Sequence, residues 1–218
     1  MDLETAMNKR HSVRQFTDQE VSREQIEHLV SLAQRSPSWV DSQPWQVYAA
    51  TGEVLQQIKA AYQEQDQAGN HGDPDLKVMS RGDWQERPQA NMKQWGHEIV
   101  HHFANYDEAH EAMTGAANNL NFAPAILFIT IPKQSPDWSI LDAGIFAQSL
   151  LLAATAEGLG SIPTYNSVRF PAILHQFLEV PEDERFMVGI EIGYPADTKI
   201  NQYWAKRQDL ADLLHFRD

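Results

Sequence analysis

Residues 97–101 read His-Glu-Ile-Val-His, which matches the H-E-x-x-H pattern of zinc proteases on a predicted helix. In that pattern two histidines on one helix face bind zinc, and the glutamate acts as the general base. The longer form of the pattern does not continue here, which leaves Glu108, His110 or Glu111 as a conceivable third ligand. We therefore expect an exposed polar helix face and no metal site, with a zinc-dependent hydrolase as the alternative.

Two polar segments are further candidates for a site. In RHSVRQF, residues 10–16, two arginines flank Ser12, and Val13 and Phe16 anchor an extended segment. An isolated pattern of this kind is most often a solvated basic turn. The second segment, SPSWVDSQPW at residues 36–45, joins a predicted helix to a predicted strand, and a loop fixed in this way is a good place for a binding site.

Other catalytic patterns do not occur in the sequence. There is no G-x-S-x-G elbow, and no G-x-G-x-x-G follows a strand, so neither an α/β-hydrolase nor a Rossmann dinucleotide site is indicated. The chain has no cysteine, which excludes disulfides, thiolate catalysis and zinc sites with sulfur ligands.

One long apolar stretch, WSILDAGIFAQSLLLAATAEGLGSIP at residues 138–163, must organise the rest of the chain. It predicts a helix with Ser135 as its N-cap, and residues 143–156 carry no charge. Apolar side chains point all round this helix, so it must be covered on every side, in part by a second subunit. A membrane span needs about 20 apolar residues, and polar residues interrupt this run, so we expect the core of a soluble protein.

Periodicity indicates the remaining elements. Helices are predicted near residues 22–36, 54–62 and 170–178, and strands near 47–49, 125–131, 161–165 and 185–194. In residues 66–118, scattered aromatic residues indicate one or two partly exposed helices, which we expect to pass over a site. Helices alternating with a few apolar strands indicate an α/β or α+β fold in three layers.

Composition limits the possible partners. A chain of 218 residues can form one large domain with a full core. Its net charge of -13 argues against binding nucleic acid or coating an anionic membrane, since both require a cationic surface. The N-terminal residues include acidic side chains and lack the apolar core of a secretory signal, so we expect a cytoplasmic protein.

Four pieces of the sequence together resemble the nitroreductase family of FMN-dependent oxidoreductases. In the order that this family has them, the pieces are RHSVRQF, SPSWVDSQPWQVYAATGE, LDAGIFAQSLLLAATAEGLGSIP and VGIEIGYP, and the resemblance ends at Lys206 and Arg207. It implies a single α+β domain over residues 1–218, with a central mixed sheet flanked by helices. It also implies a homodimer with the long buried helix at its centre, and an excursion at about residues 66–118 that covers the active site.

The resemblance further implies which residues bind FMN. The phosphate and ribityl chain would be held by Arg10, Ser12 and Arg207, with His11 beside them, and Lys206 would be a further cofactor-binding residue. Arg14 would lie near the pyrimidine edge of the flavin. The other subunit would contribute a loop with Pro37, Ser38, Trp39, Asp41 and Gln43. The backbone of one more segment would lie against the reactive edge: Pro163, Thr164, Tyr165 and Asn166. Guanidinium groups and hydroxyls are suitable donors for a phosphate dianion.

The implied function is an NAD(P)H oxidoreductase that reduces nitroaromatics or quinones in a ping-pong cycle, with NADH or NADPH as reductant. The flavin carries the hydride, so we expect no catalytic side chain. The alternatives are the zinc hydrolase and a flavin-binding module without turnover. The chain departs from the family at Asp41, where asparagine is usual, and at Ala205, where a basic residue is frequent.

Overall fold

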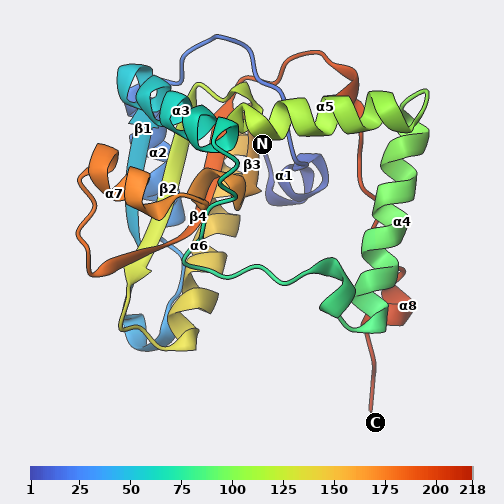
Figure 1. Ribbon diagram of the computed structural model, residues 1–218. Coiled ribbons are helices and arrows are strands. Elements are labelled where there is room, and N and C mark those ends of the chain that lie inside the picture. Colours follow the sequence, from blue (N-terminus) through green and yellow to red (C-terminus); the bar gives the residue numbers. More distant parts are fainter. Residues whose placement is uncertain (218) are drawn as a thin grey trace.

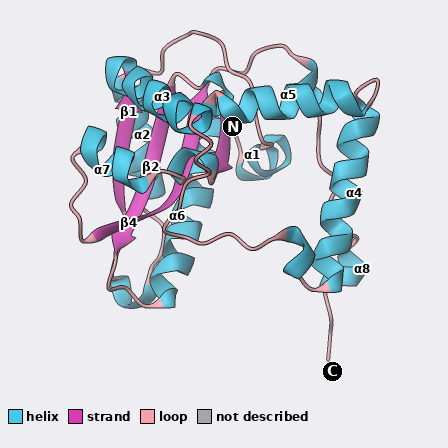
Figure 2. Cartoon of the chain, in the orientation of Figure 1, coloured by secondary structure: helices cyan, strands magenta, loops and turns pink. Residues whose placement is uncertain are grey.

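The computed structural model describes residues 1–217 of the chain, and its strands form one four-stranded sheet. The strands are β1 (Gln46–Thr51), β2 (Ala125–Pro132), β3 (Gly160–Thr164) and β4 (Glu184–Gly193). Their spatial order is β1-β2-β4-β3, and each neighbouring pair is antiparallel. Figure 2 shows the strands side by side, with helices on both faces of the sheet.

The strand directions correct our expectation of a mixed sheet. In the part of the chain that the structure describes, the parallel pairing is confined to an isolated bridge between Ser12 and Ser161 of β3. Hydrophobic periodicity indicates which faces of a strand are buried, and it carries no information about the direction in which the strand runs. The α+β class and the three layers are confirmed.

Each face of the sheet is covered by a pair of helices. On one face lie α3 (Gly52–Gln67) and α7 (Pro171–Leu178), and on the other lie α2 (Arg23–Ala33) and α6 (Asp137–Ala156). This arrangement is visible in Figure 1, where the long loops run around the rim of the layers. The sheet is therefore buried on both sides, and a binding site has to form at its edges.

Strand β2 shows how the sequence produces these layers. Leu127 and Ile129 belong to the cluster under α2 and α6, whereas Ile126 and Phe128 belong to the cluster under α3 and α7. Successive side chains of a strand point to opposite faces, so a strand buried on both faces is apolar at nearly every position, and Thr130 is the buried polar residue within β2. This requirement explains the continuous apolar run that predicted the strand.

Helix α6 is the predicted core helix. It begins at Asp137 with Pro136 as the N-cap and without a side-chain cap, so the prediction that Ser135 caps it was wrong. The helix is long and apolar enough to cross a membrane, but its inner side packs on α2 and the sheet through residues such as Phe146 and Leu150. It is a core helix of the folded domain.

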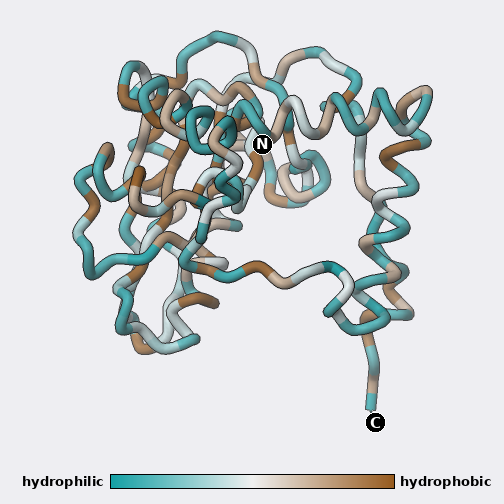
Figure 3. Tube along the Cα trace, viewed as in Figure 1, coloured by the Kyte–Doolittle hydropathy of each residue, from teal (hydrophilic) through white to brown (hydrophobic). Residues whose placement is uncertain are grey.

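Residues 66–118 contain two helices, α4 (Glu86–His102) and α5 (Tyr106–Asn118). Figure 1 shows α5 leading away from the sheet and α4 standing apart from it. In Figure 3, hydrophobic and hydrophilic colours alternate along α4, as expected for a helix that packs on one side only. That side forms a small third cluster, in which Ile99 and Phe103 of α4 meet Ile200 and Tyr203 of the C-terminal segment.

The excursion begins and ends at unusual backbone conformations. Gly72 has a φ of 81°, and a Cβ atom there would lie 2.3 Å from the carbonyl oxygen of Arg169, so only glycine fits. After α5, Leu120, Asn121 and Phe122 all have positive φ values. Such conformations cost about 1 to 3 kcal/mol for each non-glycine residue, so the surrounding packing must hold this turn in place.

The two ends of the chain carry the remaining helices, α1 (Leu3–Lys9) and α8 (Leu210–Leu213). Asp2 caps α1 by accepting a hydrogen bond from the backbone of Thr5 at 2.9 Å. In Figure 1, α1 lies near the sheet and α8 lies beside α4. The chain segments between these helices and the body form the site described next.

Candidate functional site

A small hollow lies where the N-terminal and C-terminal segments meet. Its volume is about 50 Å³. The hollow therefore has room for one compact group. The residues that line it come from both segments: Arg10, His11, Ser12, Arg14, Tyr203, Trp204, Ala205 and Arg207.

Asn201 ties the two segments together. Its side-chain oxygen accepts hydrogen bonds from the backbone N–H groups of Arg14 at 2.8 Å and Gln15 at 3.2 Å, and its amide donates to the carbonyl of Gln15 at 2.6 Å. On the opposite side, the N–H of Val13 donates to the carbonyl of Ser161 at 3.2 Å. The extended segment is thus held between β3 and the C-terminal segment, and its polar side chains are directed into the hollow.

Three guanidinium groups meet at this hollow, and we call Arg10, Arg14 and Arg207 the arginine cluster. Burial lowers the pKa of Arg10 below its usual range, and the positive charge of Arg207 lowers that pKa further. Burial also lowers the pKa of Arg14. Within residues 1–217, none of the three forms a salt bridge with a carboxylate. Arginine remains charged at physiological pH, so the cluster is suited to bind an anion.

Other side chains complete the wall of the hollow. The Tyr203 hydroxyl is buried without a hydrogen-bond partner, and burial together with the negative charge of Glu98 raises its pKa, so it remains a neutral donor. His11 stacks on Trp204 with ring centroids 4.1 Å apart. Lys206 points elsewhere, with its ammonium group 3.7 Å from the Glu98 carboxylate. The structure therefore brings His11 to the hollow and leaves Lys206 outside it.

The segment of residues 163–166 begins with the last two residues of β3 and lies close to the arginine cluster. Ser161, which pairs with Ser12, and Thr164 are about 10 Å apart along the extended strand. Pro163 and Tyr165 are exposed, while Thr164 is half-buried. The segment thus offers an exposed backbone edge beside the anion site, and a ligand with a phosphate at one end and a flat ring at the other can contact both.

The loop of residues 36–45 is fixed to α6 at two places. The Ser36 and Ser149 hydroxyls lie 2.7 Å apart, and the backbone N–H of Trp39 donates to both carboxylate oxygens of the buried Asp142, at 3.1 and 3.2 Å. Asp41 has a φ of 57°, and its carboxylate accepts a hydrogen bond from the Gln43 side chain at 3.1 Å. The loop is strained and anchored, and it exposes Trp39 on its outer side.

Within one chain the part of this loop around Trp39 lies away from the arginine cluster. The loop is held at Asp142, near the start of α6, whereas Ser12 pairs with Ser161, just beyond the end of α6 at Ala156. A helix rises about 1.5 Å per residue, so Asp142 and Ala156 are about 21 Å apart. The two groups of predicted site residues therefore lie at opposite ends of the core helix.

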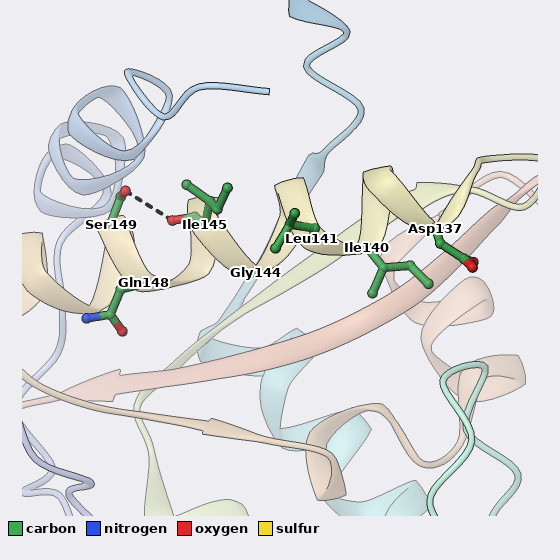
Figure 4. Close-up of a pocket in the computed structure, with 7 residues that line it drawn as sticks. All are labelled: Asp137, Ile140, Leu141, Gly144, Ile145, Gln148 and Ser149. Atoms are coloured by element: carbon green, nitrogen blue, oxygen red, sulfur yellow. Dashed lines mark hydrogen bonds between the residues drawn. The ribbon is translucent and has the colours of Figure 1, made fainter. Parts of the chain in front are cut away.

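Between these ends, α6 leaves one side uncovered. Trp138 and Leu141 are 54% and 52% exposed, and Gly144 has no atom within 4 Å of the position of a Cβ. Figure 4 shows the hollow on this side, about 720 Å³ in volume, with Ile140, Leu141, Ile145 and Gln148 along it. These residues recur at helical spacing and form one stripe, which we call the open stripe of α6.

The histidines of the H-E-x-x-H match do not form a metal centre with a third ligand. The rings of His97 and His101 are 4.0 Å apart on α4, and Glu98 faces Lys206 of the C-terminal segment. Among residues 1–217, no three histidine or acidic side chains are grouped closely enough to hold a metal ion. The geometry therefore offers no support for the zinc-hydrolase alternative.

Comparison with known families identifies the fold around these sites. The model of the nitroreductase family matches residues 7–194, which include α6, all four strands and most of the predicted site residues. The chain belongs to the nitroreductase family. The resemblance inferred from the four sequence pieces is confirmed, and so is the nitroreductase-like α+β fold.

Individual nitroreductases match over almost the whole chain. The 4-nitrobenzoate reductase of Pseudomonas putida is 27% identical over 222 residues, which cover 99% of this chain and 95% of that protein. The crystal structure of an FMN and NADPH-dependent nitroreductase, NfnB from Sphigopyxis sp. strain HMH, superposes with a TM-score of 0.91 at 23% identity. That of NfnB from Mycobacterium smegmatis in complex with NADPH has a TM-score of 0.88 at 24% identity, and both cover 100% of each chain.

In this nitroreductase, several residues that build the site had no signal in the sequence. The C-terminal segment returns to the N-terminal one, and only this return brings Asn201, Tyr203 and Trp204 to the hollow. Asp142 belongs to the site because the loop of residues 36–45 packs on α6 and binds its carboxylate. Asp142 could have been noticed in the sequence, because it is an acidic residue within a largely apolar helix. A charge that is buried in such a helix needs a hydrogen-bonding partner.

Proposed function

We propose that this nitroreductase binds FMN and uses NADH or NADPH to reduce nitroaromatic compounds or quinones in a ping-pong cycle. The observation that supports this proposal is the arginine cluster, which has no carboxylate partner within residues 1–217 and lies beside the exposed segment 163–166. When bound, FMN supplies the hydride chemistry: it accepts a hydride from the nicotinamide and passes it to the acceptor.

The residues of this chain would hold and orient the cofactor. Arg10, Ser12 and Arg207 would bind its phosphate, because guanidinium forks and a hydroxyl satisfy phosphate oxygens. The buried and unpartnered Tyr203 hydroxyl supplies one more donor. Arg14 would stabilise the negative charge that a reduced flavin carries. The protein thus contributes position and electric field, and no side chain acts as acid or base.

We further propose that the active form is a homodimer. The loop with Pro37, Ser38, Trp39, Asp41 and Gln43 is held through Trp39 at Asp142, which is about 21 Å from the end of α6 that adjoins the arginine cluster of its own chain. If two copies pack their open stripes together in antiparallel fashion, the part of the loop held at Asp142 comes nearer to the arginine cluster of the other copy than to that of its own chain. Each site would then be complete only in the dimer.

We also propose that α4 and α5 cover the active site. Trp95 and Glu98 of α4 line one surface hollow together with Arg207, and Tyr203 packs into the cluster that these helices form. The excursion therefore stands beside the proposed cofactor site, where it would shape the space for the acceptor. In this proposal the protein acts in the cytoplasm, where nicotinamides are available.

The cofactor assignment is tested on the purified protein. We expect a yellow protein with about one FMN per chain, whose visible absorption bleaches when NADH or NADPH is added without oxygen. Adding 4-nitrobenzoate or a benzoquinone should then restore the oxidised spectrum. A colourless protein that cannot be reconstituted with FMN would overturn the proposal. A flavin that is reduced but not reoxidised would favour the flavin-binding module.

The dimer is tested at Leu141, in the middle of the open stripe. Leu141→Asp places an unpaired carboxylate in the proposed interface, which we expect to raise the dimer Kd at least about 100-fold, equivalent to ~3 kcal/mol. Sedimentation should show a folded monomer that has lost FMN. Val54→Asp is the matched control, because Val54 is 38% exposed on α3, on the opposite face of the sheet. A Leu141→Asp protein that remains dimeric would place the interface elsewhere.

Asp41 has no arginine partner within residues 1–217, so its charge can act on a nearby flavin. At ~8 Å and an effective dielectric constant of ~20, its repulsion with a reduced flavin is about 2 kcal/mol. For a two-electron couple ~1.4 kcal/mol corresponds to ~30 mV, so Asp41→Asn should raise the flavin midpoint potential by some tens of millivolts. Redox titrations of the natural chain, of Asp41→Asn and of the surface control Glu53→Gln measure the midpoint potential of the flavin in each protein. An unchanged or lower midpoint potential in Asp41→Asn would show that the Asp41 carboxylate stabilises the loop through Gln43 and has no effect on the flavin.

A further inference from the structure

Glu191 is a fully buried ionisable residue in the central strand β4, and the proposed reaction does not use it. Its carboxyl group connects three parts of the chain. One oxygen, Oε1, is 2.6 Å from the Ser167 hydroxyl and 3.0 Å from the Thr164 hydroxyl. The other oxygen, Oε2, accepts a short hydrogen bond from the amide of Asn121. An isolated buried carboxyl group is strongly unfavourable, so this set of contacts requires an explanation.

The contacts around Oε1 form a triangle of oxygen atoms. The Thr164 and Ser167 hydroxyls are 2.6 Å from each other as well as from Glu191, so there are three oxygen–oxygen contacts. Two hydroxyls supply two protons, and an ionised carboxylate supplies none. One contact would then be left with facing lone pairs. A carboxylic acid supplies the third proton, and each contact becomes a hydrogen bond.

The charged and titratable surroundings agree with the neutral form. Burial raises the pKa of Glu191, against the opposing effects of its hydrogen bonds and of Lys59. Lys59 and Tyr62, both on α3, are the titratable groups near it, and each already donates to a backbone carbonyl, at 2.8 and 2.7 Å. Arg169, beyond η4 (Asn166–Val168), is paired with Asp66 at 2.5 Å. Lys59 is therefore the cation whose charge favours the ionised form.

The triangle lies directly under the segment proposed to contact the flavin. Thr164 and Ser167 bracket the exposed Tyr165 and the half-buried Asn166, and the backbone N–H of Ser167 donates to the Thr164 hydroxyl at 3.2 Å. The neighbouring strand leaves room for this arrangement, because a Cβ atom at Gly189 would lie 2.3 Å from that of Ser167. The Glu191 carboxyl group thus contacts both ends of the segment of residues 164–167 from its buried side.

We propose that Glu191 is a positioning residue, held as a neutral carboxylic acid, that fixes residues 164–167 in the conformation required by the cofactor. Through Asn121 it also connects this segment to the left-handed turn at the end of the excursion. The inference rests on the proposed flavin site. Ionisation of Glu191 removes one proton from the triangle and loosens the segment, so cofactor binding becomes sensitive to alkaline pH.

The first measurement compares FMN affinity in three variants of the full chain. Glu191→Gln keeps a neutral, hydrogen-bonding side chain of the same shape, and we expect its FMN Kd to stay within about twofold of that of the natural chain. Glu191→Leu removes the hydrogen bonds and should raise the FMN Kd about tenfold or more. Glu182→Gln, at an exposed glutamate, is the control for loss of a negative charge. Ser167→Ala, which removes one hydroxyl of the triangle, should weaken FMN binding if Glu191→Leu does not fold.

The second measurement does not depend on the cofactor. A carboxyl group whose pKa is raised by folding adds stability that is complete below the ordinary glutamate pKa of 4.5 and is lost as the pH rises through the folded-state value. From about pH 5 to about pH 9, the Tm of the apo protein should therefore fall relative to that of Glu191→Gln. If the difference in Tm between the natural chain and Glu191→Gln stays constant over this pH range, the proposal that Glu191 is a neutral carboxylic acid is wrong.

The outcomes separate this inference from the proposed function. If the natural chain binds no FMN, the proposed function fails, and the pH dependence of Tm still tests the protonation of Glu191. If the natural chain binds FMN and both Glu191→Leu and Ser167→Ala bind it equally well, the positioning role is overturned. If Glu191→Gln is as damaging as Glu191→Leu, the carboxylate is the required form and the inference is wrong.

Discussion

Replacing Leu150 with aspartate should leave the protein unfolded. Leu150 is fully buried on the inner side of α6, in the cluster between α2 and the sheet. Removing a buried leucine side chain costs about 2 to 5 kcal/mol, and an unpaired charge at the same place adds to this. Domains are stable by roughly 5 to 15 kcal/mol, so the change removes most or all of the stability. Soluble yield and circular dichroism during a urea titration measure the result.

Gln148→Asp provides the matched control on the same helix. Gln148 lies on the open stripe, so the same new charge meets solvent in the single chain. This variant should remain folded in the monomer, even where the dimer is weakened. Equal unfolding curves for Leu150→Asp and the natural chain would show that the inner side of α6 is not the core of the domain.

Replacing Arg10 with alanine should weaken FMN binding about 10-fold to 150-fold, the equivalent of ~1.5 to 3 kcal/mol for a hydrogen bond to a charged group. Arg207→Ala should have an effect in the same range. Arg10 is half-buried next to Arg207, and the two like charges repel each other when no anion is present. Arg10→Ala should therefore leave the apo protein as stable as before, or more stable.

The combination of these two results distinguishes a binding site from a structural contact. Titration of the apo protein with FMN gives the Kd, and thermal unfolding without FMN gives the stability. Arg23→Ala is the control, because Arg23 is an exposed arginine whose partner is Glu27, four residues along α2. If Arg10→Ala destabilises the apo protein and leaves the FMN Kd unchanged, then Arg10 supports the fold and does not bind phosphate.

The elements that depend on local pattern could be predicted from the sequence. The charge-free run of residues 143–156 predicts α6, and the continuous apolar run of 125–131 predicts β2, because each pattern follows from burial of that one element. Most of the candidate site was named through the family resemblance, and the structure brings together Arg10, Ser12, Arg14 and Arg207 as that resemblance implies.

The features that depend on distant parts of the chain could not be predicted. Strand direction is set by connections, so the sheet was expected to be mixed and is antiparallel. Lys206 was expected among the cofactor-binding residues, but a neighbouring residue on an extended chain points to the opposite side, and Lys206 faces Glu98. The contacts of Glu191 bring together Asn121, Thr164 and Ser167, and these residues are close to one another only after the sheet has formed.

The link made by Asn201 has a consequence for how the protein is made. Its side chain binds the backbone of Arg14 across 187 positions of the chain. Ribosomes add about 5 to 20 residues per second, so Arg14 leaves the ribosome on the order of 10 to 40 seconds before its partner is synthesised. During that interval the arginine cluster lacks the wall formed by Tyr203 and Arg207. Loading of a phosphate-bearing cofactor at the complete cluster therefore has to wait until residues 201–207 have been synthesised, and the supply of cofactor cannot guide the folding of the segments made before them.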